Sequence, residues 1–191
     1  MIDLDEYFIF AENKITLKEA SKDDSDISNI QHMTDCELEV INFDLVKRKY
    51  ANSLKLSDEV AASVDALLQI GDHIVFVEFK NGKVKNHNIK DKARDSLLIF
   101  CDVVGKTISY MRKRVDLIVV YNLEKNPLPN QIKKGRFQES PSRIAIGNYF
   151  SEKAQKEYIL FDLQRYERLY FREVHTYSKE EFREYLRLKG L

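Results

Sequence analysis

The chain is poor in the features that mark a cross-linked or strongly charged protein. Its two cysteines, Cys36 and Cys101, lie far apart and lack metal-ligand spacing, which indicates free thiols in a reducing compartment. The 31 basic and 31 acidic side chains cancel. This balance excludes a basic surface over the whole protein, so any surface for nucleic acid has to be local.

Targeting signals and several enzyme motifs are also missing. No apolar run approaches membrane-spanning length, and the acidic start MIDLDEYFIF differs from a signal peptide, so we expect a cytoplasmic protein without membrane contact. The sequence contains no internal repeat, phosphate-loop glycine pattern or nucleophilic serine or cysteine motif. We expect residues 1–191 to form one domain with its own hydrophobic core.

What the sequence does contain is a pair of apolar runs within residues 63–80, SVDALLQIGDHIVFVEFK. Gly71 and Asp72 separate the two runs and suit a two-residue hairpin turn. The second run is apolar on both faces, which is typical of a central, buried strand. We therefore predict a β-hairpin in which Ile70 pairs with His73.

This register places Asp65 directly opposite Glu78, with Lys80 on the same face roughly 7 Å further along. Two carboxylates about 5 Å apart repel each other. Partial burial increases the repulsion, so one acid takes up a proton or both share a cation. That cation is either Lys80 itself or a hard divalent metal such as Mg²⁺. Charges at the end of a central strand are costly, and this favours a functional site.

Asp65, twelve intervening residues and then Glu78-Phe79-Lys80 resemble the signature of the PD-(D/E)xK nuclease superfamily. The resemblance covers roughly residues 35–121. It implies that Asp65 and Glu78 hold Mg²⁺, for which Mn²⁺ can substitute, and that the backbone carbonyl of Phe79 is a further ligand. It also implies that Lys80 positions and activates the attacking water.

The same resemblance implies an α/β fold, with a central mixed β-sheet flanked by helices. Its restriction-endonuclease-like core, ordered helix–hairpin–helix–strand, would span about residues 35–122. Additions would precede and follow this core, and the strands and helix of residues 150–191 would pack on it. One departure from the signature is Val64, which stands in place of a proline that many members of the family also lack.

Two other interpretations stay open. A catalytically inactive binding module of the same fold, such as an immunity or regulatory protein, would use Asp65, Glu78 and Lys80 as a network of ion pairs. An unrelated globular domain would require the hairpin to be absent. Divalent-metal binding distinguishes the nuclease from the binding module.

A capping box from Thr34 to Glu37 predicts a helix that runs to about Asn52. In the resembled family the first helix often supplies another acid to the metal site. Of the available acids we favour Glu39 as the third acid of the metal site; the alternative is that Glu37 caps the helix and the others are solvent-exposed. The candidates are Glu37, Glu39, Asp44 and, just before the hairpin, Glu59.

The most basic stretch of the chain, KVKNHNIKDKAR, follows Lys80 directly. Lysine and arginine on phosphates supply most of the sequence-independent affinity for nucleic acid. We therefore predict a nucleic-acid-binding surface, with DNA as the substrate implied by the resemblance and RNA left open. A solvated positive face is the alternative, and a homodimer or a protein partner is a further expectation. The predicted contacts are Lys83, Lys85, Lys90, Lys92 and Arg94.

A helix capped by Asn88 and ended by Gly105 is predicted next, with an apolar second half that packs on the sheet. His87, just before it, is expected to be a turn residue. A buried strand is predicted over Arg114–Asn122 because its middle is uninterruptedly apolar. The three prolines lie at 127, 129 and 141, within a long loop predicted over residues 126–148.

The ends of the chain carry weaker patterns. Short strands are predicted over 7–10 and 15–17, followed by a polar loop over 18–29. Two further strands are predicted over 158–163 and 169–177. A second capping box, from Ser178 to Glu181, predicts a C-terminal helix.

Overall fold

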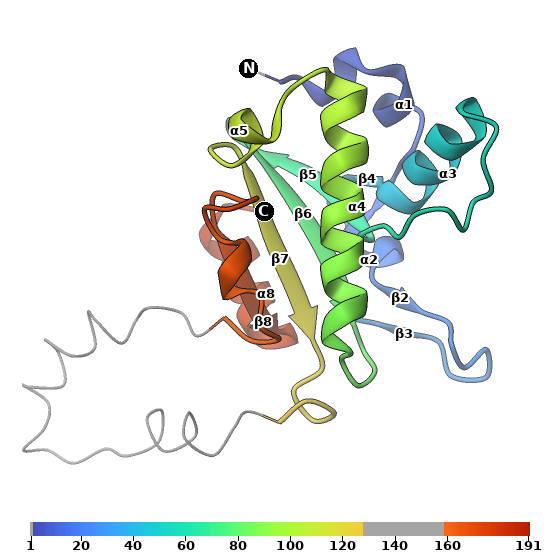
Figure 1. The fold of residues 1–191 in the computed structure, drawn as a ribbon. Coiled ribbons are helices and arrows are strands. Elements are labelled where there is room, and N and C mark those ends of the chain that lie inside the picture. Colours follow the sequence, from blue (N-terminus) through green and yellow to red (C-terminus); the bar gives the residue numbers. More distant parts are fainter. Residues whose placement is uncertain (1, 128–158) are drawn as a thin grey trace, which may run out of the picture.

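The computed structural model describes residues 2–127 and 159–191, which form an α/β fold with a mixed β-sheet flanked by helices (Figure 1). Within these residues the main sheet has six strands in the order β1-β4-β5-β6-β7-β8. Its strands are β1 (Lys14–Thr16), β4 (Glu39–Asn42), β5 (Ala66–Ile70), β6 (His73–Lys80), β7 (Val115–Tyr121) and β8 (Val174–Ser178). A separate two-stranded sheet consists of β2 (Lys22–Asp23) and β3 (Gln31–His32).

The helices differ greatly in length. The three longest are α3 (Phe43–Ser53), α4 (Asn86–Val104) and α8 (Lys179–Leu188). The short ones are α1 (Phe8–Ala11), α2 (Leu17–Ala20) and α5 (Ile108–Met111), with 3-10 turns η1 (Leu4–Glu6) and η3 (Gln164–Tyr166). None of the helices in the described part of the chain is long and apolar enough to cross a membrane.

The predicted hairpin is confirmed. Strands β5 and β6 are antiparallel and Ile70 pairs with His73, while Gly71 adopts a φ of 61°, a conformation that glycine tolerates without steric cost. Every residue of β6 except its two ends is buried. The strand lies between β5 and the parallel strand β7, so its backbone groups are paired on both sides.

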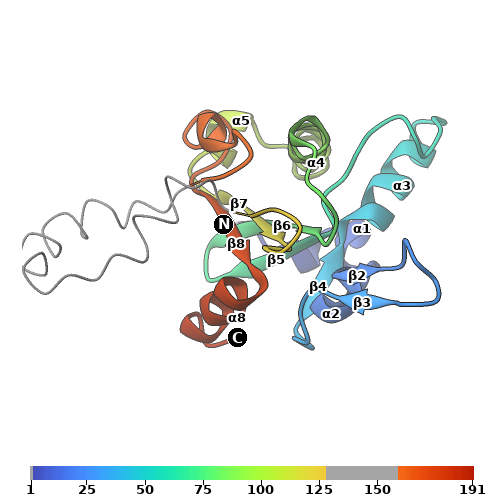
Figure 2. The same ribbon diagram turned by 90° about the horizontal axis from the view of Figure 1, so that it is seen from below.

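The sheet separates two apolar cores (Figure 2). On one face α4 crosses from β6 to β7, as parallel neighbouring strands require, and packs there with α3 and α5. Phe76 of β6 lies at the centre of this face and contacts the rings of Phe43 and Phe100. On the other face α2 and α8 cover the sheet, with the ring of Phe182 against Phe79.

Helix α3, hairpin β5–β6, helix α4 and strand β7 follow one another in the predicted order. The strand predicted over Arg114–Asn122 is confirmed as β7, and the C-terminal capping box from Ser178 to Glu181 is present. Helix α4 ends before Gly105, which has a φ of 62°. It begins at Asn86, two residues before the predicted cap.

The helix predicted to begin at Thr34 is wrong. Residues 39–42 form strand β4, and α3 begins only at Phe43, where Asn42 accepts a hydrogen bond from the Leu45 N–H. Thr34 instead accepts a local bond from the Cys36 N–H. Pairing of β4 with both β1 and β5 outweighs the local capping pattern, because tertiary context overrides weak local preferences.

Four predictions near the ends of the chain are also corrected. Residues 8–11 form helix α1 instead of a strand, and the polar segment 18–29 contains most of α2 and all of β2. Residues 160–163 lie in a turn, and the strand predicted over 169–177 is the shorter β8. The loop predicted over 126–148 lies outside the described residues apart from its first two.

Candidate functional site

Asp65 and Glu78 meet at the carboxyl end of β6, as the hairpin register predicts. The Asp65 N–H donates to the Val77 carbonyl at 3.1 Å, and Ala66 is paired with Val77. Both carboxylates contact one ammonium group, since the Lys92 Nζ lies 3.2 Å from Asp65 Oδ1 and 3.0 Å from Glu78 Oε2. The two acids are therefore close enough to share a single cation.

Lys80 completes the predicted trio. Its Nζ lies 2.6 Å from Glu78 Oε1, and its side chain is 25% exposed. Glu78 itself is 0% exposed, whereas 18% of the Asp65 side chain is exposed. Solvent therefore reaches this cluster at Asp65 and at both lysines, since the Lys92 side chain is 24% exposed.

Lys92 is a fourth member of the cluster that the sequence reasoning assigned elsewhere. It was predicted to contact nucleic acid, but the structure turns its side chain from α4 toward the two carboxylates. The signal was present in the sequence: position 92 lies three residues after Ile89 and four before Ser96, both buried on the inner face of α4. We call Asp65, Glu78, Lys80 and Lys92 the charged cluster.

Helix α4 also holds the segment that leads into Asp65. Asp95 accepts a hydrogen bond from the Ala62 N–H, and Ser96 accepts one from the Val64 N–H, each at 2.9 Å. The Asp65 carboxylate is fixed in turn, because its Oδ2 accepts a 2.6 Å hydrogen bond from the Phe79 N–H. The position of Asp65 is thus set by both its own strand and the crossover helix.

Burial and the charge of Glu78 raise the pKa of Asp65 to about 7, against the opposing effect of Lys92. For Lys92, burial alone lowers the pKa, but attraction to Glu78 and Asp65 outweighs burial and the pKa is raised. Lys92 therefore stays charged at neutral pH. Asp65 changes its charge within the physiological range.

The donor set fits a hard divalent cation. Asp65 and Glu78 supply carboxylate oxygens of the kind that Mg²⁺ prefers. Glu78 Oε1 is buried and lacks a well-aligned hydrogen bond, although two ammonium groups lie nearby. The Phe79 carbonyl points to the same side of β6 as the N–H that bonds Asp65, because both groups of one strand residue face the same neighbour. These residues would hold a metal whose remaining ligands are waters.

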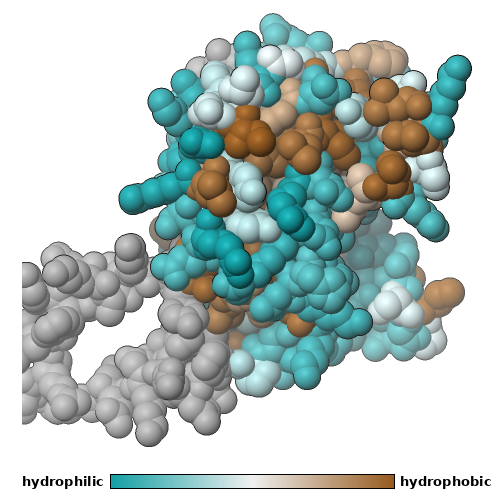
Figure 3. Space-filling view, viewed as in Figure 1, coloured by the Kyte–Doolittle hydropathy of each residue, from teal (hydrophilic) through white to brown (hydrophobic). Residues whose placement is uncertain are grey.

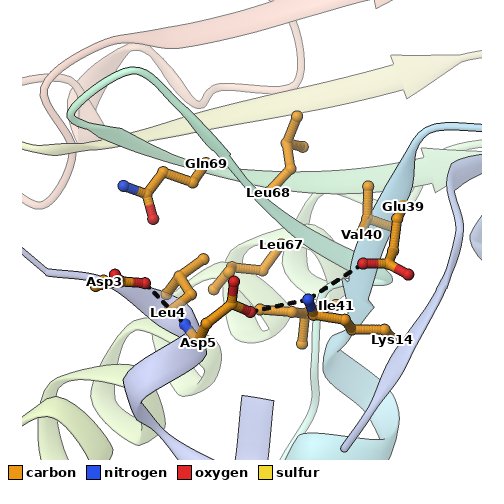
Figure 4. A pocket seen from close by; sticks show the side chains of 10 residues that line it. All are labelled: Asp3, Leu4, Asp5, Lys14, Glu39, Val40, Ile41, Leu67, Leu68 and Gln69. Carbon is orange, nitrogen blue, oxygen red and sulfur yellow. Dashed lines mark hydrogen bonds and ion pairs between the residues drawn. The ribbon is translucent and has the colours of Figure 1, made fainter. Parts of the chain in front are cut away.

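A third acid is not brought to the cluster, and groups of three or more metal-ligating side chains do not occur in the described residues. The prediction that Glu39 contributes to the metal site is wrong. It lies beyond the Ile41–Leu67 pair on the side away from Asp65, and it pairs with Lys14. Glu39 and Lys14 line a separate pocket of about 170 Å³, where Lys14 also pairs with Asp5 (Figure 4).

The other acids that were considered have different surroundings. Glu37 pairs with Lys18 at the surface, and Glu59 is exposed. Asp44, in the first turn of α3, accepts a short hydrogen bond from the Ser63 hydroxyl, and its charge contributes to the raised pKa of Lys92. Of these three acids, Asp44 is therefore the one whose charge acts on the charged cluster.

The predicted nucleic-acid contacts do not form one surface of free cations. Lys90 pairs with Asp162, and Arg94 pairs with Asp91. Lys83 and Lys85 are exposed just before α4. With Lys92 turned inward, two of the five predicted residues remain exposed cations that form no ion pair within the described residues.

In comparisons with known proteins, no family model matches the chain, and no curated protein or solved structure is significantly similar to it.

Proposed function

We propose that this protein is a Mg²⁺-dependent nuclease that hydrolyses phosphodiester bonds, with DNA as the first substrate to test. The observation that carries the proposal is the meeting of Asp65 and Glu78 within reach of one cation, with the Lys80 ammonium beside them. The helix–hairpin–helix–strand order around this meeting point supports a restriction-endonuclease-like core. Two buried acids at the end of a central strand cost stability, so a functional site explains them better than a purely structural ion pair.

The residues of the cluster have distinct roles in this proposal. Asp65, Glu78 and the Phe79 carbonyl hold Mg²⁺, which when bound supplies positive charge and lowers the pKa of a water ligand. Lys80 lies beside Glu78 with its side chain 25% exposed, so it can orient the attacking water and offset negative charge that develops on the phosphate. Lys92 is held between the carboxylates and balances part of their charge.

Cleavage of supercoiled plasmid DNA in Mg²⁺ or Mn²⁺ tests the proposal. We expect Asp65→Asn, Glu78→Gln and Lys80→Ala each to lower the rate at least about 100-fold, the usual scale for losing a preorganised charged group. Lys113→Ala, an exposed lysine before β7, is the matched control and should cleave at the wild-type rate. Cleavage that persists unchanged in Asp65→Asn would refute the assignment.

A binding module that uses the cluster as an ion network is the second candidate. It is favoured by one observation: Lys80 and Lys92 already supply two positive charges for the two carboxylates. Titration of Mn²⁺ into wild type and Asp65→Asn by calorimetry separates the two functions. Heat of binding that disappears in the variant supports the nuclease, and absence of heat in both supports the binding module.

A further inference from the structure

A polar pocket opens beside the charged cluster. It has a volume of about 350 Å³, and Asp65, Phe79 and Lys80 form the part that belongs to the hairpin. The rest comes from β2 and its flanks, from the residue after β3, from the turn after β6 and from the loop after β7. These further lining residues are Ser21, Lys22, Asp23, Ser25, Met33, Asn81, Gly82 and Lys125.

A buried asparagine joins the walls of this pocket. Asn81 is 7% exposed, and its Nδ2 donates to Asp23 at 2.8 Å and to Gln31 at 3.0 Å, which attaches the β2–β3 sheet. Its Oδ1 accepts a 2.9 Å bond from Asn122 at the end of β7. The pocket is therefore a built feature, because a single side chain fixes segments that are far apart in the sequence.

A second asparagine fixes the loop that carries Lys125. Asn126 Nδ2 donates to the Gly82 carbonyl at 3.0 Å, and its Oδ1 accepts a 2.8 Å bond from the Val84 N–H. The Lys125 N–H donates to Asn122 Oδ1 at 3.3 Å. These bonds hold the backbone of Lys125 at the rim of the pocket before any ligand binds.

The pocket carries cations that are available to a ligand. Lys22 and Lys125 are exposed, and within the described residues neither forms an ion pair. Of the two acids in the lining, Asp23 accepts hydrogen bonds from Asn81 and the Ser25 N–H and also interacts with the charge of Lys125, and Asp65 belongs to the charged cluster. Figure 3 shows a largely hydrophilic surface in the lower half of the molecule, into which β6 and β7 run. An anion is the ligand that this pocket suits.

We infer that this pocket binds a phosphate group of a nucleic-acid strand next to the bond that is cut, with Lys22 and Lys125 as its contacts. The inference rests on the proposed nuclease function, since Asp65 and Lys80 line the same pocket. A volume near the lower end of the range for small-ligand pockets, roughly 300–1,000 Å³, fits one nucleotide unit of a single strand better than a duplex. Neither lysine belongs to the nuclease signature.

Binding of a fluorescently labelled single-stranded oligonucleotide in EDTA tests the inference, because metal-dependent cleavage is absent there. We expect the double substitution Lys22→Ala and Lys125→Ala to weaken binding at least about 10-fold. The slope of log affinity against log salt should fall in magnitude by roughly 0.7, the value for one lost phosphate contact on a single strand. The matched control is Lys106→Ala with Lys113→Ala, which removes the same charge near the opposite end of β7.

Wild-type affinity in the control with loss in the pocket variant supports the inference. Equal losses in both double variants would overturn it, because net charge alone would then explain the binding. Inorganic phosphate distinguishes the source of the ligand: if it competes as well as an equal concentration of oligonucleotide phosphate, the strand assignment is overturned.

Cleavage and binding measured on wild type and on the pocket variant separate this inference from the proposed function. If wild type does not cleave DNA but its oligonucleotide binding depends on Lys22 and Lys125, the pocket assignment stands and the nuclease proposal fails. If wild type cleaves and the pocket variant retains its wild-type KM, the nuclease proposal stands and the pocket assignment is overturned.

Discussion

Asp65 lies in surroundings very different from those of a free side chain in water. Burial and the neighbouring Glu78 raise its pKa to about 7 from an ordinary value of 3.8. The folded protein therefore holds a proton on Asp65 more tightly than the unfolded chain does. The resulting stabilisation is fully present below about pH 4 and is lost as the pH rises toward 7.

The free energy of unfolding of the metal-free protein should reflect this pKa. Between pH 4 and 7 it should fall more steeply with pH in wild type than in Asp65→Asn, by at most about 4 kcal/mol over the interval. Urea denaturation at a series of pH values in EDTA measures both curves. Parallel curves for the two proteins would show that folding does not raise the pKa of Asp65.

Lys92 gives a second prediction at this scale. Removing its ammonium in Lys92→Met leaves two carboxylates with one nearby cation, so the metal-free protein should lose about 3 kcal/mol of stability. Mg²⁺ or Mn²⁺ should restore much of that loss, because a bound ion can replace the ammonium. Thermal unfolding in EDTA and in metal provides the measurement.

Lys113→Met is the control for Lys92→Met, because Lys113 is exposed. The control should neither lose stability in EDTA nor gain it on addition of metal. Failure of both metals to stabilise Lys92→Met would contradict the metal-holding role of the carboxylates. It would favour the ion-network interpretation.

At the scale of elements, the sequence predicts best where local signals and long-range pairing agree. The β5–β6 hairpin could be predicted because Gly71 marks its turn and the alternating side chains fix its register. The meeting of Asp65 with Glu78 follows from that register alone. Strand β4 could not be predicted from its sequence, because its four residues become a strand only by pairing with β1 and β5.

The boundary between β4 and α3 is testable through its cap. Asn42→Ala removes the acceptor for the Leu45 N–H and should cost about 1 kcal/mol of stability. Thr34→Ala, at the cap that local sequence favours, should stay within about 0.5 kcal/mol of wild type. Urea denaturation measures the stability of both variants. A larger loss in Thr34→Ala than in Asn42→Ala would support a helix that begins at Thr34.

At the scale of the whole molecule, the charged cluster combines residues from a local hairpin with a residue from a distant helix. Its acids and Lys80 come from one hairpin, whereas Lys92 reaches them from the crossover helix on one face of the sheet (Figure 2). The pocket beside it draws on segments from residue 21 to residue 125. No local pattern specifies which of these segments meet, so sequence reasoning found the acids and missed the pocket.

Asn81 makes this long-range assembly testable. Asn81→Ala leaves Asp23, Gln31 and Asn122 without their shared partner, so the β2–β3 sheet should open locally more often than the rest of the protein. Hydrogen exchange at residues 22–32 should accelerate at least about 10-fold, while the amides of β6 and β7 remain protected. Asn88→Ala, an exposed position in the first turn of α4, is the matched control and should leave exchange unchanged. Uniform acceleration across β6 and β7 would instead mean that Asn81 supports the whole fold, and unchanged exchange at residues 22–32 would mean that the small sheet is held by other contacts.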